Sequence, residues 1–192
     1  LMQFMDGNRI DLSFHPLEAI PRLIQDSLSI VLLDKDGCIP TLPPASESSY
    51  LPRPPTAKQF ADCCNEFWWL NPYVAKALWR SEIPHAKYIL DTPLRGQLMK
   101  ILTWHFGVLT SFSLPPGKMG KRFPEVLDAA LWSALLRTYS DAQPENVWAA
   151  LLKMDTIFRQ TAHSVANHFN YPYPTAEDEK VSNFVQHIHS LC

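Results

Sequence analysis

The sequence predicts an α+β protein in which the edge of an α/β sheet is followed by a C-terminal helical bundle. Three observations predict this class. Two alternating apolar stretches about an Asp-Gly turn open the chain, a pattern typical of a β-hairpin. A segment rich in Pro and Ser covers residues 39–55, and each later stretch repeats its apolar residues at helical spacing. We therefore expect a sheet region at 1–38, a linker at 39–55 and a helical bundle at 56–192.

The composition is that of a globular protein, because 46% of the 192 residues are hydrophobic and can bury a core. A formal net charge of -2 argues against a nucleic-acid-binding surface over the whole molecule. No apolar run approaches the ~20 residues that span a bilayer, and no signal-peptide pattern opens the chain, so we expect a cytoplasmic protein without a membrane partner. The cysteines contain no C-x-x-C and indicate neither a disulfide framework nor a zinc site: Cys38, Cys63, Cys64 and Cys192.

The N-terminal region combines short strands with one short helix. Residues 1–14 form the expected hairpin, residues 17–26 can form an amphipathic helix, and the SIVLL run at 29–33 is typical of a buried strand. These strands are too few for a stable sheet. Since the chain also begins at Leu1 within a predicted strand, we expect a fragment whose partner strands lie upstream or in another chain.

Five helices are expected in the bundle. The first covers 56–80, with a kink or break at Asn71-Pro72, because proline lacks a backbone donor and disfavours helical geometry in the residue before it. The others follow in order: one from 81–84 to Trp104, bent or divided at Pro93, then 124–139 after a basic loop at 113–122, Pro144 to about Phe169, and 176–191.

The helix at 56–80 is expected to show two different faces. At 100° per residue, one arc is apolar and the other is acidic and aromatic. A carboxylate beside indole and phenol rings suits a cationic, hydroxyl-rich ligand, whereas the alternative is that these tryptophans simply belong to the core. The apolar arc holds Phe60, Cys63, Phe67, Val74 and Leu78, and the acidic-aromatic stripe holds Asp62, Glu66, Trp69, Tyr73 and Arg80.

Asp11 is a candidate metal ligand. A carboxylate in mid-strand, between apolar neighbours, is costly to bury unless a cation compensates it, and the alternative is an exposed strand residue. Asp34 and Asp36 belong to a D-K-D-G sequence that is ordinary turn chemistry.

Lys118 and Lys121 follow a Pro-Pro-Gly sequence and can surround a polyphosphate or form a solvated basic loop. The full Walker pattern is absent. Near the end of the chain, His187, His189 and Cys192 are typical either of a metal site or of a polar helix face.

Four segments together resemble the aminoglycoside 6-adenylyltransferases, which are streptomycin-modifying enzymes of the polymerase-beta-like nucleotidyltransferase superfamily. The resemblance covers essentially the whole chain in the right order. It implies an N-terminal nucleotidyltransferase domain, of which residues 1–38 are the C-terminal part, and a substrate-binding bundle, with ATP and the antibiotic between them. The segments are MDGNRIDLSF at 5–14, VLLDKDG at 31–37, CCNEFWWLNPYVAKALWR at 63–80 and GKMGK at 117–121.

The resemblance also implies a role for Asp11. In that superfamily two carboxylates of a D-x-D pattern after a glycine-serine helix start, and a third on a neighbouring strand, bind Mg²⁺; Asp11 stands where the third belongs. A D-x-D preceded by Gly-Ser does not occur in the 192 residues. We therefore expect a fragment that transfers no AMP alone.

The remaining implied roles concern the two substrates. The triphosphate of ATP is expected near Lys118 and Lys121, and the guanidinium groups of the aminoglycoside against Glu66, Trp69 and Tyr73. Glu66 is also a candidate general base, although a base could equally lie outside these residues. The alternative function is a non-catalytic helical relative that only binds a ligand or partner.

Overall fold

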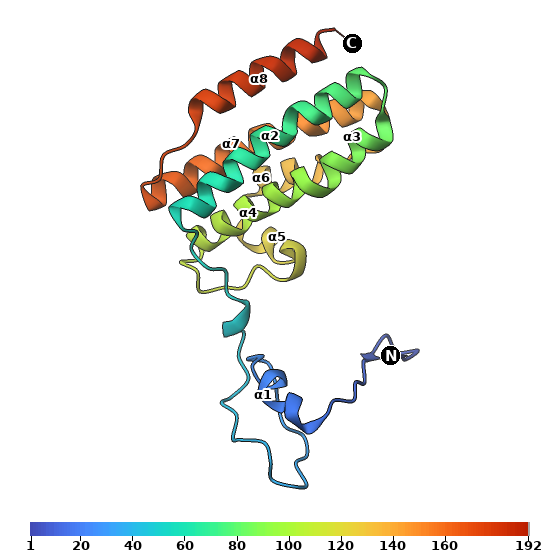
Figure 1. Cartoon of the computed structure of the whole chain (residues 1–192), viewed down its shortest axis with the longest axis vertical. Helices are drawn as coiled ribbons and strands as arrows, with labels where there is room; N and C mark the ends of the chain where they lie inside the picture. Colours follow the sequence, from blue (N-terminus) through green and yellow to red (C-terminus); the bar gives the residue numbers. More distant parts are fainter. Residues whose placement is uncertain (192) are drawn as a thin grey trace. The chain divides into compact units, whose positions relative to one another are not determined.

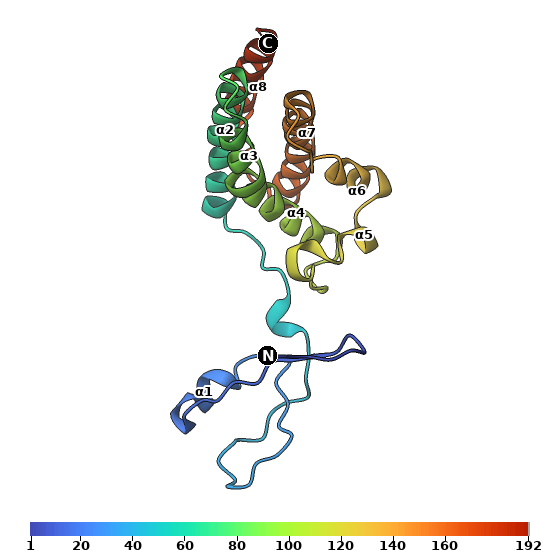
Figure 2. The ribbon, with the colours of Figure 1, turned by 90° about the vertical axis from the view of Figure 1, so that its right-hand side faces the viewer.

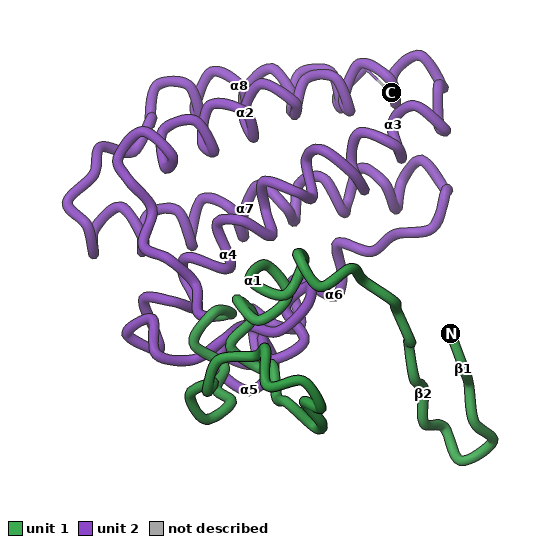
Figure 3. Tube along the Cα trace, turned by 60° about the horizontal axis from the view of Figure 1, so that its bottom comes forward, with its two compact units in different colours: residues 1–50 green, residues 51–192 purple. Residues whose placement is uncertain are grey.

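The computed structural model describes residues 1–191. Its chain divides into two compact units, Leu1–Tyr50 and Leu51–Cys192 (Figure 3). The division falls within the Pro- and Ser-rich segment. The first unit contains a small sheet and the second is helical, so the predicted α+β class is confirmed.

The first unit opens with the predicted hairpin. β1 (Met2–Gln3) pairs antiparallel with β2 (Arg9–Ile10), with Met2 opposite Ile10. The turn between them needs Gly7, whose φ of 89° lies in the region that favours glycine. Each strand has 2 residues, which is shorter than the alternation in the sequence predicts.

The predicted strand at 29–33 is wrong. These residues form an irregular segment, with Leu32 88% exposed. Within residues 1–191 the sheet consists of β1 and β2, so the apolar run has no strand edge to pair with. The amphipathic helix before it is present as η1 (Leu17–Ala19) and α1 (Ile20–Leu23).

The turn predicted after this segment is confirmed. The Asp34 carboxylate accepts hydrogen bonds from the backbone N–H groups of Ile39 and Cys38, at 2.8 and 3.3 Å. The unit ends with η2 (Ser48–Tyr50), where the Tyr50 hydroxyl donates to Asp26 at 2.6 Å.

The second unit begins with α2 (Ala57–Trp79), whose start is fixed by a capping box. Thr56 Oγ1 accepts from the Gln59 N–H at 3.2 Å, and Gln59 Oε1 accepts from the Thr56 N–H at 2.9 Å. The helix continues through Pro72, so of the predicted kink or break at Asn71-Pro72 the break is wrong, and the kink stays a prediction. Packing of α2 against its neighbouring helices outweighs the cost of an internal proline, which is about 3 kcal/mol.

The predicted bend or division at Pro93 takes the form of a π-helical turn between two α-helices. α3 (Ile83–Ile89) and α4 (Arg95–Leu109) flank η3 (Leu90–Leu94), a π-helical turn that contains the proline. A wider turn accommodates the missing backbone donor without ending the helical path.

The single helix predicted at 124–139 is wrong. α5 (Phe123–Val126) ends where Leu127 becomes extended, and α6 (Ala129–Leu136) begins anew. The Asp128 carboxylate accepts from the Leu131 N–H at 2.8 Å and so acts as an N-cap, a local hydrogen bond that favours a helix start over a helix interior.

The last two helices are confirmed as α7 (Pro144–Phe169) and α8 (Thr175–His189). Asn170, in the left-handed conformation at φ 56°, ends α7. Figures 1 and 2 show that the axes of α2, α7 and α8 lie nearly along one direction. α8 packs along α2, and α4 packs along α7.

The core of the bundle lies beneath α2. The apolar arc predicted for this helix is buried, and the Phe67 and Phe158 rings stack at 3.7 Å. Burial raises the pKa of Cys63 to about 12, so this thiol stays protonated. Within residues 1–191, no helix combines the length and the apolar character needed to cross a membrane.

Removal of the stacked ring should destabilise the protein strongly. Because Phe158 is 0% exposed, we expect Phe158→Ala to lower the free energy of unfolding by about 3–5 kcal/mol, measured by urea denaturation. The matched control is Phe14→Ala, at a ring 90% exposed, which should change it by less than about 0.5 kcal/mol. Equal effects of the two substitutions would contradict the assigned core.

Candidate functional site

The acidic-aromatic stripe predicted on α2 is exposed along its whole length. Trp69, 62% exposed, is its most prominent ring, while the neighbouring Trp68 is buried. The alternative that these tryptophans belong to the core therefore holds for Trp68 and not for Trp69. The exposed members are Asp62, Glu66, Trp69, Tyr73 and Arg80.

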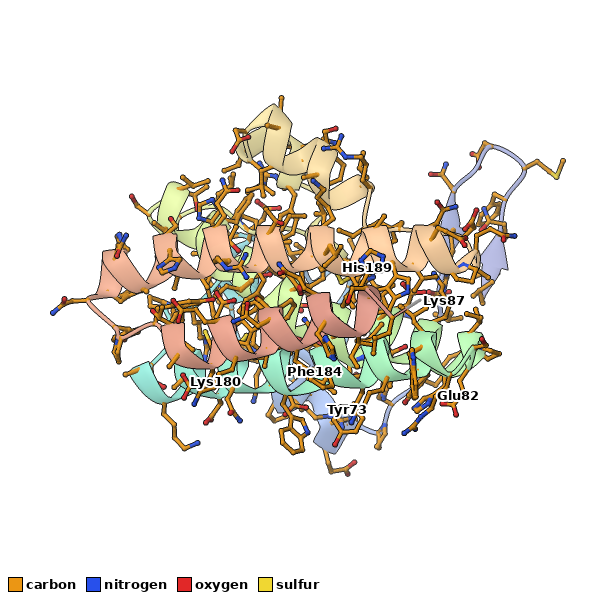
Figure 4. The ribbon with its side chains drawn as sticks, turned by 90° about the horizontal axis from the view of Figure 1, so that it is seen from above. Tyr73, Glu82, Lys87, Lys180, Phe184 and His189 are labelled. Carbon is orange, nitrogen blue, oxygen red and sulfur yellow. The ribbon has the colours of Figure 1, made fainter. Side chains whose placement is uncertain are left out.

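Part of the stripe lines a cleft between α2 and α8, of about 320 Å³, which we name the α2–α8 cleft. In the view from above, α8 lies alongside α2, with Tyr73 on α2 and Phe184 on α8 (Figure 4). The lining consists of Asn65, Trp68, Trp69, Pro72, Tyr73 and Lys76 from α2, and Glu177 and Val181 from α8.

The aromatic wall of the cleft is an i, i+4 pair. The Trp69 and Tyr73 ring centroids lie 5.9 Å apart, with the ring planes tilted by 57°. The Lys76 ammonium lies 4.5 Å from the centroid of the Tyr73 ring. The chain therefore already places one cation on this wall.

The structure separates the predicted site residues. Glu66 is exposed on the stripe but is not among the described residues that line the α2–α8 cleft. The carboxylate in the lining is instead Glu177, which the sequence did not single out because it comes from another helix.

Asp11 follows β2 and is paired with Arg9. The guanidinium donates to both carboxylate oxygens, from Nη2 at 2.7 Å and from Nε at 3.1 Å, and both side chains are more than half exposed. Across residues 1–191, no three His, Cys, Asp or Glu side chains gather to hold a metal ion. The described residues therefore do not complete a magnesium site.

Lys118 and Lys121 are exposed on the loop after α4, at η4 (Lys118–Gly120). Gly120 shapes this loop, because its φ is 74° and a Cβ there would come within 2.6 Å of the Phe123 ring. The loop packs against α4. The two lysines are on this loop and the stripe is on α2, so the two sets of predicted site residues belong to separate elements.

The histidines near the end of the chain are on α8. The His189 ring lies 4.7 Å from that of Trp148, a contact typical of a helix face packed on its neighbour. Cys192, the third member of the possible metal set, lies outside the described residues.

A buried polar pair behind the cleft was not predicted. Asn71 Nδ2 donates to Asp155 Oδ1 at 2.6 Å, joining α2 to α7 in the core. Burial raises the pKa of Asp155 to about 7, and Asn71 Oδ1 has no hydrogen-bond partner among the described residues. A proton on the carboxyl provides a donor for such an acceptor, so the pair is best satisfied when Asp155 is protonated.

A second polar cluster attaches α8. Arg159 of α7 donates twice to Asp178 at 2.6 Å, and the Tyr173 hydroxyl donates to the same carboxylate at 2.7 Å. Burial acts to raise the pKa of Asp178, but the hydrogen bonds, that from Arg159 first, hold it below its usual value. These charge-assisted bonds attach the start of α8 to α7.

A helical bundle with an aromatic cleft, following a small hairpin-bearing unit in the chain, defines an α+β protein with a candidate site for a cationic small molecule. Comparison with known proteins gives the family. The chain belongs to the streptomycin adenylyltransferase family, whose model matches residues 1–188. The resemblance noted in the sequence is thereby confirmed.

The similar curated proteins are aminoglycoside 6-adenylyltransferases. That of Campylobacter jejuni is 36% identical, over 96% of this chain and 64% of its own length. That of Bacillus subtilis is 32% identical, over 98% and 67%. A crystal structure of an aminoglycoside 6-adenyltransferase from Bacillus subtilis matches with a TM-score of 0.67 and 32% identity, covering 97% of this chain and 68% of that one. The chain thus spans about two thirds of the length of these relatives.

The buried acid predicts a specific pH dependence. Its pKa is about 7 in the folded state against an ordinary 3.8, so the folded protein holds a proton that the unfolded chain loses. The contribution of this proton to the free energy of unfolding is complete below about pH 4. It falls by about 1.4 kcal/mol per pH unit as the pH rises from about 4 to 7, where the folded-state pKa lies. Because Asn carries a permanent donor, we expect Asp155→Asn to match the wild type near pH 4 and to be more stable at pH 8.

The measurement is urea denaturation of both proteins between pH 4 and 8. Asp178→Asn is the control, because it removes an ionised partner of Arg159 and should destabilise the protein at pH 8. An Asp155→Asn protein less stable than the wild type at pH 8 would refute the proton on Asp155.

Proposed function

We propose that the chain is part of an enzyme that transfers AMP from ATP to a hydroxyl of an aminoglycoside such as streptomycin. The observation that carries this proposal is the 30–36% identity to aminoglycoside 6-adenylyltransferases along nearly all of the chain. The helical bundle is the substrate-binding part, because the α2–α8 cleft offers aromatic faces and a carboxylate to a cationic sugar.

We propose Asp11 as one of the ligands of Mg²⁺. Its carboxylate is exposed, and its partner Arg9 is itself exposed and can turn away. The other carboxylates are expected in a D-x-D segment after a Gly-Ser pair, which these 192 residues lack. The spacing recurs at Asp34 and Asp36, but Asp34 is used in its turn. Residues 1–192 alone are therefore proposed to transfer no AMP.

Lys118 and Lys121 are proposed to contact the triphosphate of ATP. Both ammonium groups are exposed on a short loop whose conformation depends on glycines, an arrangement that suits an extended anion. Glu66, Trp69 and Tyr73 are proposed to contact the aminoglycoside from the exposed face of α2. Glu66 is a candidate base for the attacking hydroxyl, and a base outside these residues is the alternative.

A second candidate function is a helical relative that binds a ligand or partner without catalysis. The observation in its favour is that the bundle forms its cleft from its own helices, whereas residues 1–191 gather no complete metal site.

The metal role of Asp11 is tested in a protein that includes both residues 1–192 and the expected D-x-D segment of the natural gene. With Mg²⁺, ATP and streptomycin, we expect Asp11→Asn to abolish AMP transfer, because a neutral amide weakens the hold on a divalent ion. Circular dichroism should show unchanged folding. Asp36→Asn, at an exposed turn residue, is the control and should retain activity. Full turnover by Asp11→Asn, or any transfer by residues 1–192 alone, argues against these assignments.

Trp69 is tested by calorimetric titration of streptomycin. Loss of a stacking surface should weaken binding by roughly 1–3 kcal/mol in Trp69→Ala. Trp79→Ala is the matched control, since Trp79 is an exposed tryptophan of the same helix that does not line the α2–α8 cleft. Unchanged affinity in Trp69→Ala would remove this residue from the site.

A further inference from the structure

The two walls of the α2–α8 cleft carry side chains of opposite charge. Its α2 wall presents the Trp69 and Tyr73 rings and the Lys76 ammonium, and its α8 wall presents the Glu177 carboxylate. We propose that the Glu177 carboxylate binds a protonated guanidino or amino group of the substrate, and that the substrate ring bearing this group stacks on Trp69. We further propose that the Lys76 ammonium opposes the binding of this cation. This inference rests on the proposed function, since it specifies which part of an aminoglycoside the cleft holds.

The size of the cleft suits one ring of the ligand. About 320 Å³ is at the lower end of the range for small-molecule sites, which is roughly 300–1,000 Å³. An aminoglycoside consists of several rings, so the cleft can enclose a single cation-bearing ring while the rest of the molecule extends outward along the exposed stripe.

The position of Lys76 decides which aromatic face is available. Its ammonium lies over the Tyr73 ring at 4.5 Å, so a ligand cation on that ring would meet a like charge. Trp69, 62% exposed, is the better stacking surface, and indole is also the strongest aromatic partner for a cation. A cation between Trp69 and Glu177 gains from both groups without displacing Lys76 from the Tyr73 ring, while the like charge of Lys76 still opposes its binding.

Glu177 is held in place by its neighbour in sequence. Asp178 is bound by Arg159, Tyr173 and Ser182 through hydrogen bonds of 2.6 to 2.9 Å. The backbone of the first turn of α8 therefore has little freedom, so that only the exposed side chain of Glu177 is left to be ordered when a ligand arrives. Such preorganisation reduces the entropic cost of binding.

The test is calorimetric titration of the 192-residue chain with streptomycin and with streptidine, its guanidino-bearing ring taken alone. Glu177→Gln should weaken the binding of both probes by on the order of tenfold, the effect of losing one charge-assisted contact. Lys76→Gln should strengthen both, because it removes a competing cation. Glu179→Gln is the control, an exposed carboxylate of the same helix outside the cleft lining, and should bind like the wild type.

The outcomes separate the two proposals. Opposite shifts in Glu177→Gln and Lys76→Gln support the inference, even if the protein from the natural gene transfers no AMP. Wild-type affinity in Glu177→Gln, equal weakening by Glu179→Gln, or no binding of streptidine overturns the inference while leaving AMP transfer as a separate result. Thermal melts of each variant establish that the bundle is intact.

Discussion

The bundle depends on one buried hydrogen bond, that between Asn71 of α2 and Asp155 of α7. A polar pair in an apolar core must remain paired, because an orphaned amide or carboxyl costs more than the bond itself contributes. The two helices are therefore confined to the one register in which these side chains meet. That register turns the apolar arc of α2 into the core and leaves Trp69 and Tyr73 outside. The hydrogen bond of Asn71 also lies next to Pro72, where α2 lacks a backbone donor, so a contact with α7 supports the helix at its weakest point.

The second wall of the cleft is fixed by charge. Arg159 reaches from α7 to Asp178 of α8, and its guanidinium also lies 5.5 Å from the Trp68 ring of α2. One side chain of α7 thus contacts both helices that line the α2–α8 cleft. Since α7 is the helix that carries both Asp155 and Arg159, the two walls are positioned by a common element and hold their separation together.

Features that depend only on helical periodicity could be predicted from the sequence. The two faces of α2 follow from helical periodicity, and Trp69 and Tyr73 could be found for that reason. The strand at 29–33, the break at Pro72 and the single helix at 124–139 failed because each depends on a partner that periodicity does not contain: a strand edge, a packed neighbour and the capping carboxylate of Asp128. Asp155 lies 84 residues from Asn71, so its role appears only once α2 and α7 are packed.

The residues proposed for ligand binding and those proposed for the metal belong to different parts of the chain. The ion pair between Arg9 and Asp11 is exposed, and such pairs contribute only about 0–1 kcal/mol, so a divalent ion would displace the guanidinium at little cost. The pair orients the carboxylate, but the described residues do not supply the further ligands that a magnesium ion requires. The described lining of the α2–α8 cleft, in contrast, comes from the bundle alone, because Glu177, Trp69 and the polar bonds that hold their helices all belong to residues 51–191. The proposed ligand contacts of the bundle and the proposed metal role of Asp11 can therefore be tested independently of each other.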